Sequence, residues 1–302
     1  MKYEIYKLKF TTGVHFGSGM LNDSGYTFQA DTLFSAMYIE ALKGGLEQQL
    51  YQMVCSGRLL FSDGLPYVED LYMIPKPVLY IEPRDRGNSG DKKKYKKLKY
   101  LPTDQLDAYL AGNLEPDQDP MKDFGHFSQR TMAAVRREEE ALPYQVGIFY
   151  YGEGRGLYVI VGYEGQEQLE LAENLLDAVS HVGIGGKKSG GLGKFILERG
   201  KPGGKLKERL GQTGDHQMLL SCALPRKEEM ESAVEGASYL LEKRSGFVTS
   251  ETYAPELRKK KDLYVFSAGS CFRKTFRGGI YDVSEGGSHP VYRYAVPVFM
   301  GV

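Results

Sequence analysis

Hydrophobic and polar residues alternate at the start of the chain in the pattern of a half-buried strand. Over residues 3–11, Tyr6 and Leu8 fall on one face, and Lys7 and Lys9 fall on the other. The alternation predicts a strand, and the glycine-rich segment TTGVHFGSGMLNDSG that follows predicts a loop.

The next segment, TLFSAMYIEALK, has the period of a helix. Leu33, Phe34 and Met37 fall on one stripe. Asp31 stands where an N-cap residue belongs, and Gly44 stands where helices commonly end. The pattern therefore predicts a helix that is capped by Asp31 and ends near Gly44.

Further segments complete a recognisable order. A short apolar strand is predicted at 58–62, a strand-turn-strand unit at 145–163, a helix at 167–182 and a strand at 194–198. The order strand, helix, strand, insertion, strand, helix, strand is that of a ferredoxin-like (RRM-like) domain, so we predict an α+β fold for residues 1–200.

Two regions interrupt this order. Residues 80–135 are rich in charge, proline and glycine and have no clear period, so we expect a solvent-exposed insertion of low order. The segment 201–215 is predicted to be a linker. Strand-like runs and a short helix after Pro225 then predict a second, smaller ferredoxin-like domain at 212–302.

Composition limits the classes of function. With 39 basic and 39 acidic residues the net charge is zero, which excludes binding through bulk positive charge but leaves local basic patches open. Cys55, Cys222 and Cys271 are widely spaced and predict neither a disulfide framework nor a zinc site. No signal peptide or membrane span is predicted, so we expect a cytoplasmic protein with no membrane partner and no cofactor.

The segment HVGIGGKKSGGLGKF, residues 181–195, is the most informative. Six of the eleven residues from Gly183 to Gly193 are glycine, and Lys187 and Lys188 lie at the centre. Such a loop exposes backbone N–H groups, lets another backbone approach and supplies cations for phosphate. It matches neither the P-loop nor the dinucleotide-binding motif. Contact with a phosphate backbone and a plain flexible connection are the two interpretations.

The chain as a whole resembles the RAMP superfamily of CRISPR-associated proteins. GIGGKKSGGLGKF before a last strand, the helix ADTLFSAMYIEAL and the loop FTTGVHFGSG are similar to that superfamily. The segments EKRSGFVTSE, YVFSAGSCF, FRGGIYDV and HPVYRYAVPVFMGV are similar to the subunit-four family of type III-A (Csm) complexes. The resemblance covers both ends and the middle of the chain and weakens across 80–135.

The resemblance implies a non-catalytic RNA-binding subunit of a type III CRISPR interference complex. Such a subunit holds the 5′ handle of the guide RNA and links the large polymerase-like subunit to the backbone RAMP subunits. Backbone amides, cations and stacking side chains, which hold single-stranded RNA, agree with this role. By position, the expected handle-binding residues are His15, Phe16, Gly185, Gly186, Lys187, Lys188, Ser189, Gly190 and Gly191.

His15 leaves alternatives open. It lies near where metal-independent guide-processing ribonucleases of the same superfamily place a general acid/base histidine, so an endoribonuclease that uses His15 is the alternative function. A contact with RNA or another subunit and plain structural packing are the other interpretations. The matching subunit of a type III-B (Cmr) complex is a further alternative, which changes the partners but not the chemistry.

Asp31, His126 and two further aspartates are the remaining candidates for chemistry. Backbone subunits of these complexes cut target RNA with an aspartate in a region comparable to that of Asp31, but its place before a helical run favours helix capping. His126, Asp119 and Asp123 lack tight ligand spacing, so no metal site is predicted.

Two basic segments have two interpretations each. KKKYKKLK, residues 92–99, is either a solvated charge run or an insertion that grips guide or target phosphate through Lys92, Lys93 and Lys94. FRKTFRGG mixes basic and aromatic residues and fits either nucleic-acid binding or an alternating strand that faces another subunit.

Overall fold

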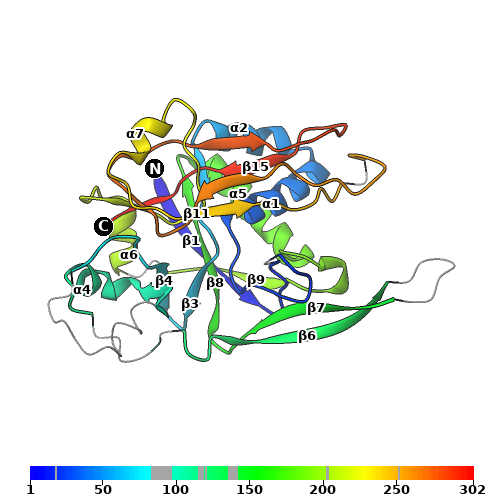
Figure 1. Ribbon diagram of the computed structural model, residues 1–302, viewed down its shortest axis with the longest axis horizontal. Coiled ribbons are helices and arrows are strands. Elements are labelled where there is room, and N and C mark those ends of the chain that lie inside the picture. Colours follow the sequence, from blue (N-terminus) through cyan, green and yellow to red (C-terminus); the bar gives the residue numbers. More distant parts are fainter. Residues whose placement is uncertain are drawn as a thin grey trace.

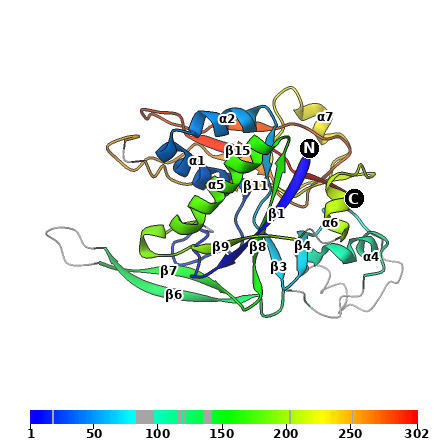
Figure 2. The same cartoon turned by 180° about the vertical axis from the view of Figure 1, so that it is seen from behind.

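The structure is a computed structural model of the chain (Figure 1). It describes residues 1–17, 19–82, 97–114, 119, 121–134, 142–201, 204–250 and 252–302. Both termini lie at the same end of the molecule (Figures 1 and 2). Within these ranges, no helix is both long and apolar enough to cross a membrane.

A seven-stranded antiparallel sheet forms the centre of the fold. Its strands follow the order β5-β4-β3-β8-β1-β9, and β2 also pairs with β8. These strands are β1 Lys2–Phe10, β2 Leu59–Phe61, β3 Leu65–Val68, β4 Leu71–Pro75, β5 Tyr100–Pro102, β8 Arg155–Tyr163 and β9 Phe195–Arg199.

The central strand β8 is buried on both faces. Leu157 and Val159 belong to one hydrophobic cluster, and Tyr158 and Ile160 belong to another. Because successive side chains of a strand point to opposite faces, two cores sandwich this strand. An apolar run without polar interruption is the sequence pattern that such a strand needs.

Helices cover one of these faces. The first cluster includes side chains of α1 Ala30–Gly44, α2 Glu47–Cys55 and α5 Gln166–Val182, which lie together in both views (Figures 1 and 2). Phe34 of α1 and Leu176 of α5 are fully buried there, as their spacing predicts. The strands predicted at 3–11, 58–62 and 194–198 and the helices predicted to end near Gly44 and to span 167–182 are present, whereas α2, β3 and β4 were not predicted.

The region 80–135 contains more regular structure than predicted. Its described part forms β5, the 3₁₀ turn η1 Thr103–Gln105, α4 Leu106–Leu110 and β6 Gly125–Ala134. The prediction of low order is wrong for these residues. The side chains of β6 are mostly exposed on both faces, so no alternation marks the strand in the sequence.

The two strands predicted at 145–163 are confirmed, but they belong to different sheets. β7 Leu142–Tyr151 pairs with β6 over ten residues, whereas β8 pairs with β1, β2 and β3. The β6–β7 ribbon extends away from the central sheet along the base of the molecule (Figures 1 and 2).

The predicted linker is partly helical. α6 Gly204–Leu210 lies within it, and its Leu206 and Leu210 are buried in the second cluster. The linker prediction is therefore wrong for these residues, because two leucines four positions apart supply an apolar helix face.

The carboxyl-terminal residues form short strands and one short helix. Strands β13-β10-β16 make one sheet, β11-β12 a second and β14-β15 a third. The elements are β10 Gln217–Leu219, α7 Met230–Val234, β11 Leu241–Arg244, β12 Leu263–Phe266, β13 Cys271–Phe272, β14 Gly279–Asp282, β15 Tyr292–Ala295 and β16 Phe299–Gly301. A mixed α/β fold with antiparallel sheets is thus confirmed. The boundaries of two domains stay a prediction.

The carboxyl-terminal region shares a core with the rest of the chain. Tyr294 of β15 is fully buried, with its ring 5.5 Å from that of Phe34 and 6.0 Å from that of Phe61. The Phe61 backbone N–H donates to the Tyr294 hydroxyl at 2.8 Å. This contact places β15 beside α1, and the ion pair between Arg244 of β11 and Asp31 of α1 places β11 there as well.

Candidate nucleic-acid interface

The glycine-rich loop joins α5 to β9 and is fixed by backbone hydrogen bonds. Ile184 N donates to Gly193 O at 3.0 Å, and Gly193 N donates to Gly13 O at 2.9 Å. Gly186 N donates to His15 O at 2.9 Å. The loop is therefore held against the segment that contains His15, and the interpretation as a merely flexible connection does not describe its first half.

Gly185 and Gly186 are required by close contact. A Cβ atom on Gly185 would lie 2.7 Å from His15 O and 2.9 Å from the Phe16 ring, at a φ of +95°. A Cβ atom on Gly186 would lie 2.7 Å from His15 Cδ2. Real side chains do not tolerate these distances, so glycine lets the two segments meet.

The second half of the loop has looser surroundings. A Cβ atom on Gly190 would meet only Met132 Cε at 3.4 Å, and one on Gly191 would meet nothing within 4 Å. These residues and the exposed Ser189 belong to the short turn η2 Lys188–Gly190 and its end. They lie beside the contact with His15 and do not take part in it.

His15 is buried and its orientation is fixed. Its side chain is only 6% exposed, and Nδ1 lies 2.7 Å from Gly147 O. A carbonyl only accepts hydrogen bonds, so Nδ1 carries a proton and donates it in this contact. The ring thus joins the β6–β7 ribbon to the glycine-rich loop.

The loop, the His15 segment and the carboxyl-terminal region enclose a cavity of about 600 Å³. We call it the basic cavity. One wall consists of His15, Phe16, Gly185, Gly186 and Lys188. A second set of lining residues, which we call the second wall, contains Asp31, Glu242, Arg244, Lys260 and Arg293. Four cationic side chains face two carboxylates, so the lining carries an excess of positive charge.

Asp31 holds the cations of the second wall in position. Its carboxylate accepts from Arg244 Nη2 at 2.7 Å and Nε at 3.0 Å, and it also pairs with Arg293 Nη1. Burial alone would raise the pKa of Asp31, but the ion pairs with both arginines outweigh burial and hold the pKa below its usual value.

The predicted role of Asp31 as a helix cap is wrong. Helix α1 begins at Ala30, and the Asp31 side chain makes no capping hydrogen bond. The carboxylate of Asp63 instead accepts from Ala30 N at 2.8 Å and from Cys222 N at 2.8 Å. A distant carboxylate therefore satisfies the helix terminus and leaves Asp31 for the arginines.

The two lysines of the loop have different surroundings. Lys187 Nζ lies 3.2 Å from the Tyr144 hydroxyl and 4.7 Å from the centre of its ring, so this lysine points to the β6–β7 ribbon. Lys188 lines the basic cavity, and burial lowers its pKa. Burial and the nearby Arg293 also lower the pKa of Lys260. Burial thus disfavours the charged form of both lysines that line the cavity.

The structure brings only some of the candidate RNA-binding residues into the basic cavity. His15, Phe16, Gly185, Gly186 and Lys188 line it, whereas Lys187, Ser189, Gly190 and Gly191 lie beside it. Lys92, Lys93 and Lys94 lie outside the described residues. Among the described residues, no cluster of His, Cys, Asp or Glu suited to a metal ion is present.

Sequence reasoning missed the cations of the second wall. Arg293 is only 6% exposed, and its Nε has no hydrogen-bond partner among the described residues. Its position between Tyr292 and Tyr294 in an apolar strand was an available signal, because buried arginine is rare without a partner. Lys260 carried no local signal at all.

Solved structures share this fold over the whole chain. The crystal structure of a Csm3–Csm4 subcomplex in the type III-A CRISPR–Cas interference complex aligns with a TM-score of 0.67 at 18% identity, covering 100% of this chain and 99% of that chain. A Csm1–Csm4 cassette in complex with cA4 aligns with a TM-score of 0.61 at 19% identity, covering 100% and 98%. The fold is thus one found in type III CRISPR assemblies.

Sequence comparison narrows this class to one family. Residues 212–302 match the family model described as the CRISPR Csm4 C-terminal domain. The CRISPR system Cms protein Csm4 of Mycobacterium tuberculosis (strain ATCC 25618 / H37Rv) is 38% identical over 291 residues, which cover 95% of this chain and 94% of that protein. The chain belongs to the Csm4 family. The predicted membership in the subunit-four family of type III-A complexes is confirmed.

Proposed function

We propose that this protein is a non-catalytic, cytoplasmic subunit of a type III-A interference complex that holds the 5′ handle of the guide RNA. The observation that carries the proposal is the basic cavity, where the glycine-rich loop, the His15 segment and four cationic side chains meet. Single-stranded RNA is held by cations and by backbone groups that allow close approach.

The lowered pKa values of Lys188 and Lys260 are consistent with a phosphate ligand in the basic cavity. Burial lowers the pKa of Lys188 and of Lys260, so each loses part of its preference for the charged form. A phosphate between the two walls would favour the charged form again. Phosphate binding and lysine charge would then stabilise one another.

The proposed partners are a large polymerase-like subunit and a backbone RAMP subunit. The solved structures that resemble this chain are a Csm1–Csm4 cassette and a Csm3–Csm4 subcomplex. Csm4 chains of other systems thus assemble with two different proteins. We propose that this chain likewise links one partner to the other.

The fold of the first 200 residues supports a ferredoxin-like assignment. Strands β9-β1-β8-β3 are adjacent and antiparallel, and the crossovers from β1 and from β8 contain α1 and α5. This is the arrangement of two split β-α-β units. We propose that 212–302 is a second, smaller unit of the same kind, although its strands form three separate small sheets.

The contacts of His15 indicate that this residue positions the glycine-rich loop and does not catalyse a reaction. Its ring is buried, Nδ1 is engaged by Gly147 O, and its backbone oxygen accepts from the loop. These contacts account for the residue without a proton-transfer step. Repeat RNA incubated with the purified protein should therefore stay intact; specific cleavage that disappears in His15→Ala would contradict the proposal.

Binding measurements test the cavity itself. Lys188→Ala and Lys260→Ala should each weaken binding of handle RNA and reduce the slope of log K against log salt by about 0.7, the value for one phosphate contact on a single strand. Lys194→Ala is the matched control, because Lys194 is an exposed lysine at the end of the same loop and does not line the cavity. If Lys188→Ala and Lys260→Ala bind handle RNA with the same affinity and the same salt slope as Lys194→Ala, the proposed site is refuted.

A further inference from the structure

A second cavity of about 620 Å³ adjoins the basic cavity. The two share Thr27, Phe28, Gln29 and Glu242 in their linings, so they are separated only by the segment before α1 and one side chain of β11. We call it the neighbouring cavity. An RNA strand bound in the basic cavity would therefore lie close to the neighbouring cavity.

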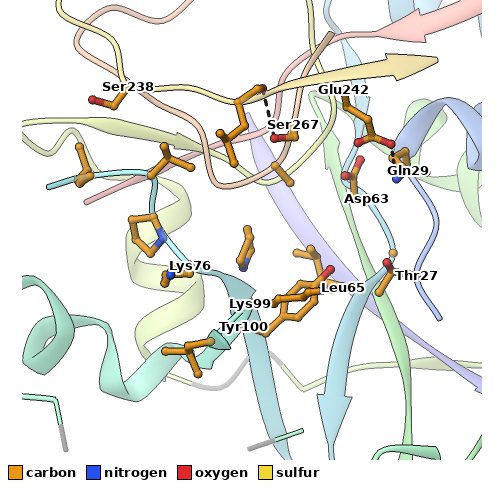
Figure 3. A pocket seen from close by; sticks show the side chains of 18 of the residues that line it. Thr27, Gln29, Asp63, Leu65, Lys76, Lys99, Tyr100, Ser238, Glu242 and Ser267 are labelled. Carbon is orange, nitrogen blue, oxygen red and sulfur yellow. Dashed lines mark hydrogen bonds between the residues drawn. The ribbon is translucent and has the colours of Figure 1, made fainter. Parts of the chain in front are cut away.

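The neighbouring cavity has a cationic end and an acidic end. Figure 3 shows Lys76 and Lys99 on one side and Asp63, Gln29 and Glu242 on the other. Burial lowers the pKa of Lys76 because it disfavours the charged form of the amine. Apolar side chains, including Leu65 and Pro77, form the walls between these two ends.

The mouth of the cavity presents an aromatic ring. Tyr80 lines the cavity although 90% of its side chain is exposed to solvent. Exposed aromatic rings beside a basic groove are the usual platforms on which unpaired bases stack. A ring that packs on little of its own protein is available for this contact.

The acidic end has acceptor capacity left. Glu242 Oε1 accepts from Gln29 Nε2 at 2.8 Å and from Arg244 Nη1 at 3.0 Å. A carboxylate offers about four acceptor positions, so a further donor can be bound. Exocyclic amino groups of adenine, cytosine and guanine are such donors, whereas uracil has none.

We propose that the neighbouring cavity binds one unpaired nucleotide of the RNA strand that occupies the basic cavity, and that it favours a base with an exocyclic amino group over uracil. Lys76 and Lys99 contact the phosphate, Tyr80 stacks on the base and Glu242 accepts from the amino group. The volume suits a ligand of this size. This inference rests on the proposed function, because the basic cavity supplies the rest of the strand.

Anisotropy measurements with the full chain and handle RNA test the inference. Tyr80→Ala should weaken binding about tenfold. The double variant Lys76→Ala/Lys99→Ala should reduce the salt slope by about 1.4, for two phosphate contacts. Lys207→Ala is the matched control, since Lys207 is an exposed lysine of α6 that does not line either cavity. Unchanged melting temperatures will show that the variants fold.

A uracil scan of the RNA tests the choice of base. Single replacements of amino-bearing bases by uracil should identify one position at which wild-type binding falls severalfold, and the Tyr80→Ala/Lys76→Ala/Lys99→Ala variant should not distinguish the two RNAs at that position. A scan with the same profile in both proteins would overturn the inference. Saturable binding of AMP that handle RNA does not displace would also overturn it, because the ligand would then be a free nucleotide.

The variants of the basic cavity distinguish a failure of this inference from a failure of the proposed function. If Lys188→Ala and Lys260→Ala weaken RNA binding but the variants of the neighbouring cavity do not, the inference is wrong and the proposed function stands. The inference is also wrong, and the proposed function stands, if the variants of the neighbouring cavity keep their RNA affinity but no longer bind a partner protein. If no variant changes RNA affinity, both are wrong.

Discussion

The two walls of the basic cavity are built in opposite ways. One wall depends on the absence of side chains, since Gly185 and Gly186 let the loop backbone press against His15. The other wall depends on long charged side chains, since Arg244 and Arg293 converge on Asp31. The first wall depends on close backbone packing, and the second depends on ion pairs. Substitutions in the two walls should therefore change stability by different amounts and for different reasons.

The largest expected effect lies in the charged wall. Asp31→Asn removes the carboxylate that neutralises the buried Arg293 and the partly buried Arg244, and breaking a buried pair from one side costs about 3–5 kcal/mol of unfolding free energy. Chemical denaturation measures this loss. Asp262→Asn is the control, because Asp262 pairs with Lys243 at the surface, and it should leave stability nearly unchanged. Equal losses in both variants would contradict the assignment.

The carboxylate of Asp63 differs from that of Asp31, because its contribution to stability should depend on pH between 4 and 8. Burial raises the pKa of Asp63 from 3.8 to about 7, although N–H groups of Cys222 and Ala30 oppose the shift. A raised pKa gives stability that is complete below pH 3.8 and is lost as pH rises to about 7, at up to about 1.4 kcal/mol for each pH unit. Asp63→Asn keeps an oxygen acceptor and should remove this decline. Stability curves from pH 4 to pH 8 test the expectation; a variant with the wild-type slope would contradict it.

The smallest expected effect concerns the glycine-rich loop and compares its first half, which lines the cavity, with its second half, which does not. Gly185→Ala should cost about 1–3 kcal/mol, because the new Cβ would lie 2.7 Å from His15 O. Gly190→Ala should be nearly neutral, since only the flexible end of Met132 lies near its Cβ. Thermal melts compare the pair. A loss as large in Gly190→Ala would show that the second half of the loop is also packed.

The glycine wall was predictable from the sequence, and the charged wall was not. Six glycines within eleven residues predict that another backbone approaches the loop closely. Apolar residues at helical spacing predict α1 and α5. Arg244 and Arg293 lie 213 and 262 residues from Asp31, so no local pattern could pair them. The capping rule failed at Asp31 because a long-range ion pair prevailed over a local preference.

The β6–β7 ribbon shows a second limit. Its outer strand β6 is exposed on both faces, so the two-residue period that reveals a half-buried strand is missing. Backbone pairing with β7 defines this strand, and backbone pairing leaves no mark in the side-chain pattern. The strand β7, which buries Val146 and Ile148, was predicted.

The structure of the assembled complex with its guide RNA bound would test the central claim most directly. The account predicts that handle phosphates lie within hydrogen-bond distance of Lys188 and Lys260, with the RNA backbone against Gly186. A handle that follows another surface, with the basic cavity empty or filled by a segment of a partner protein, would contradict it.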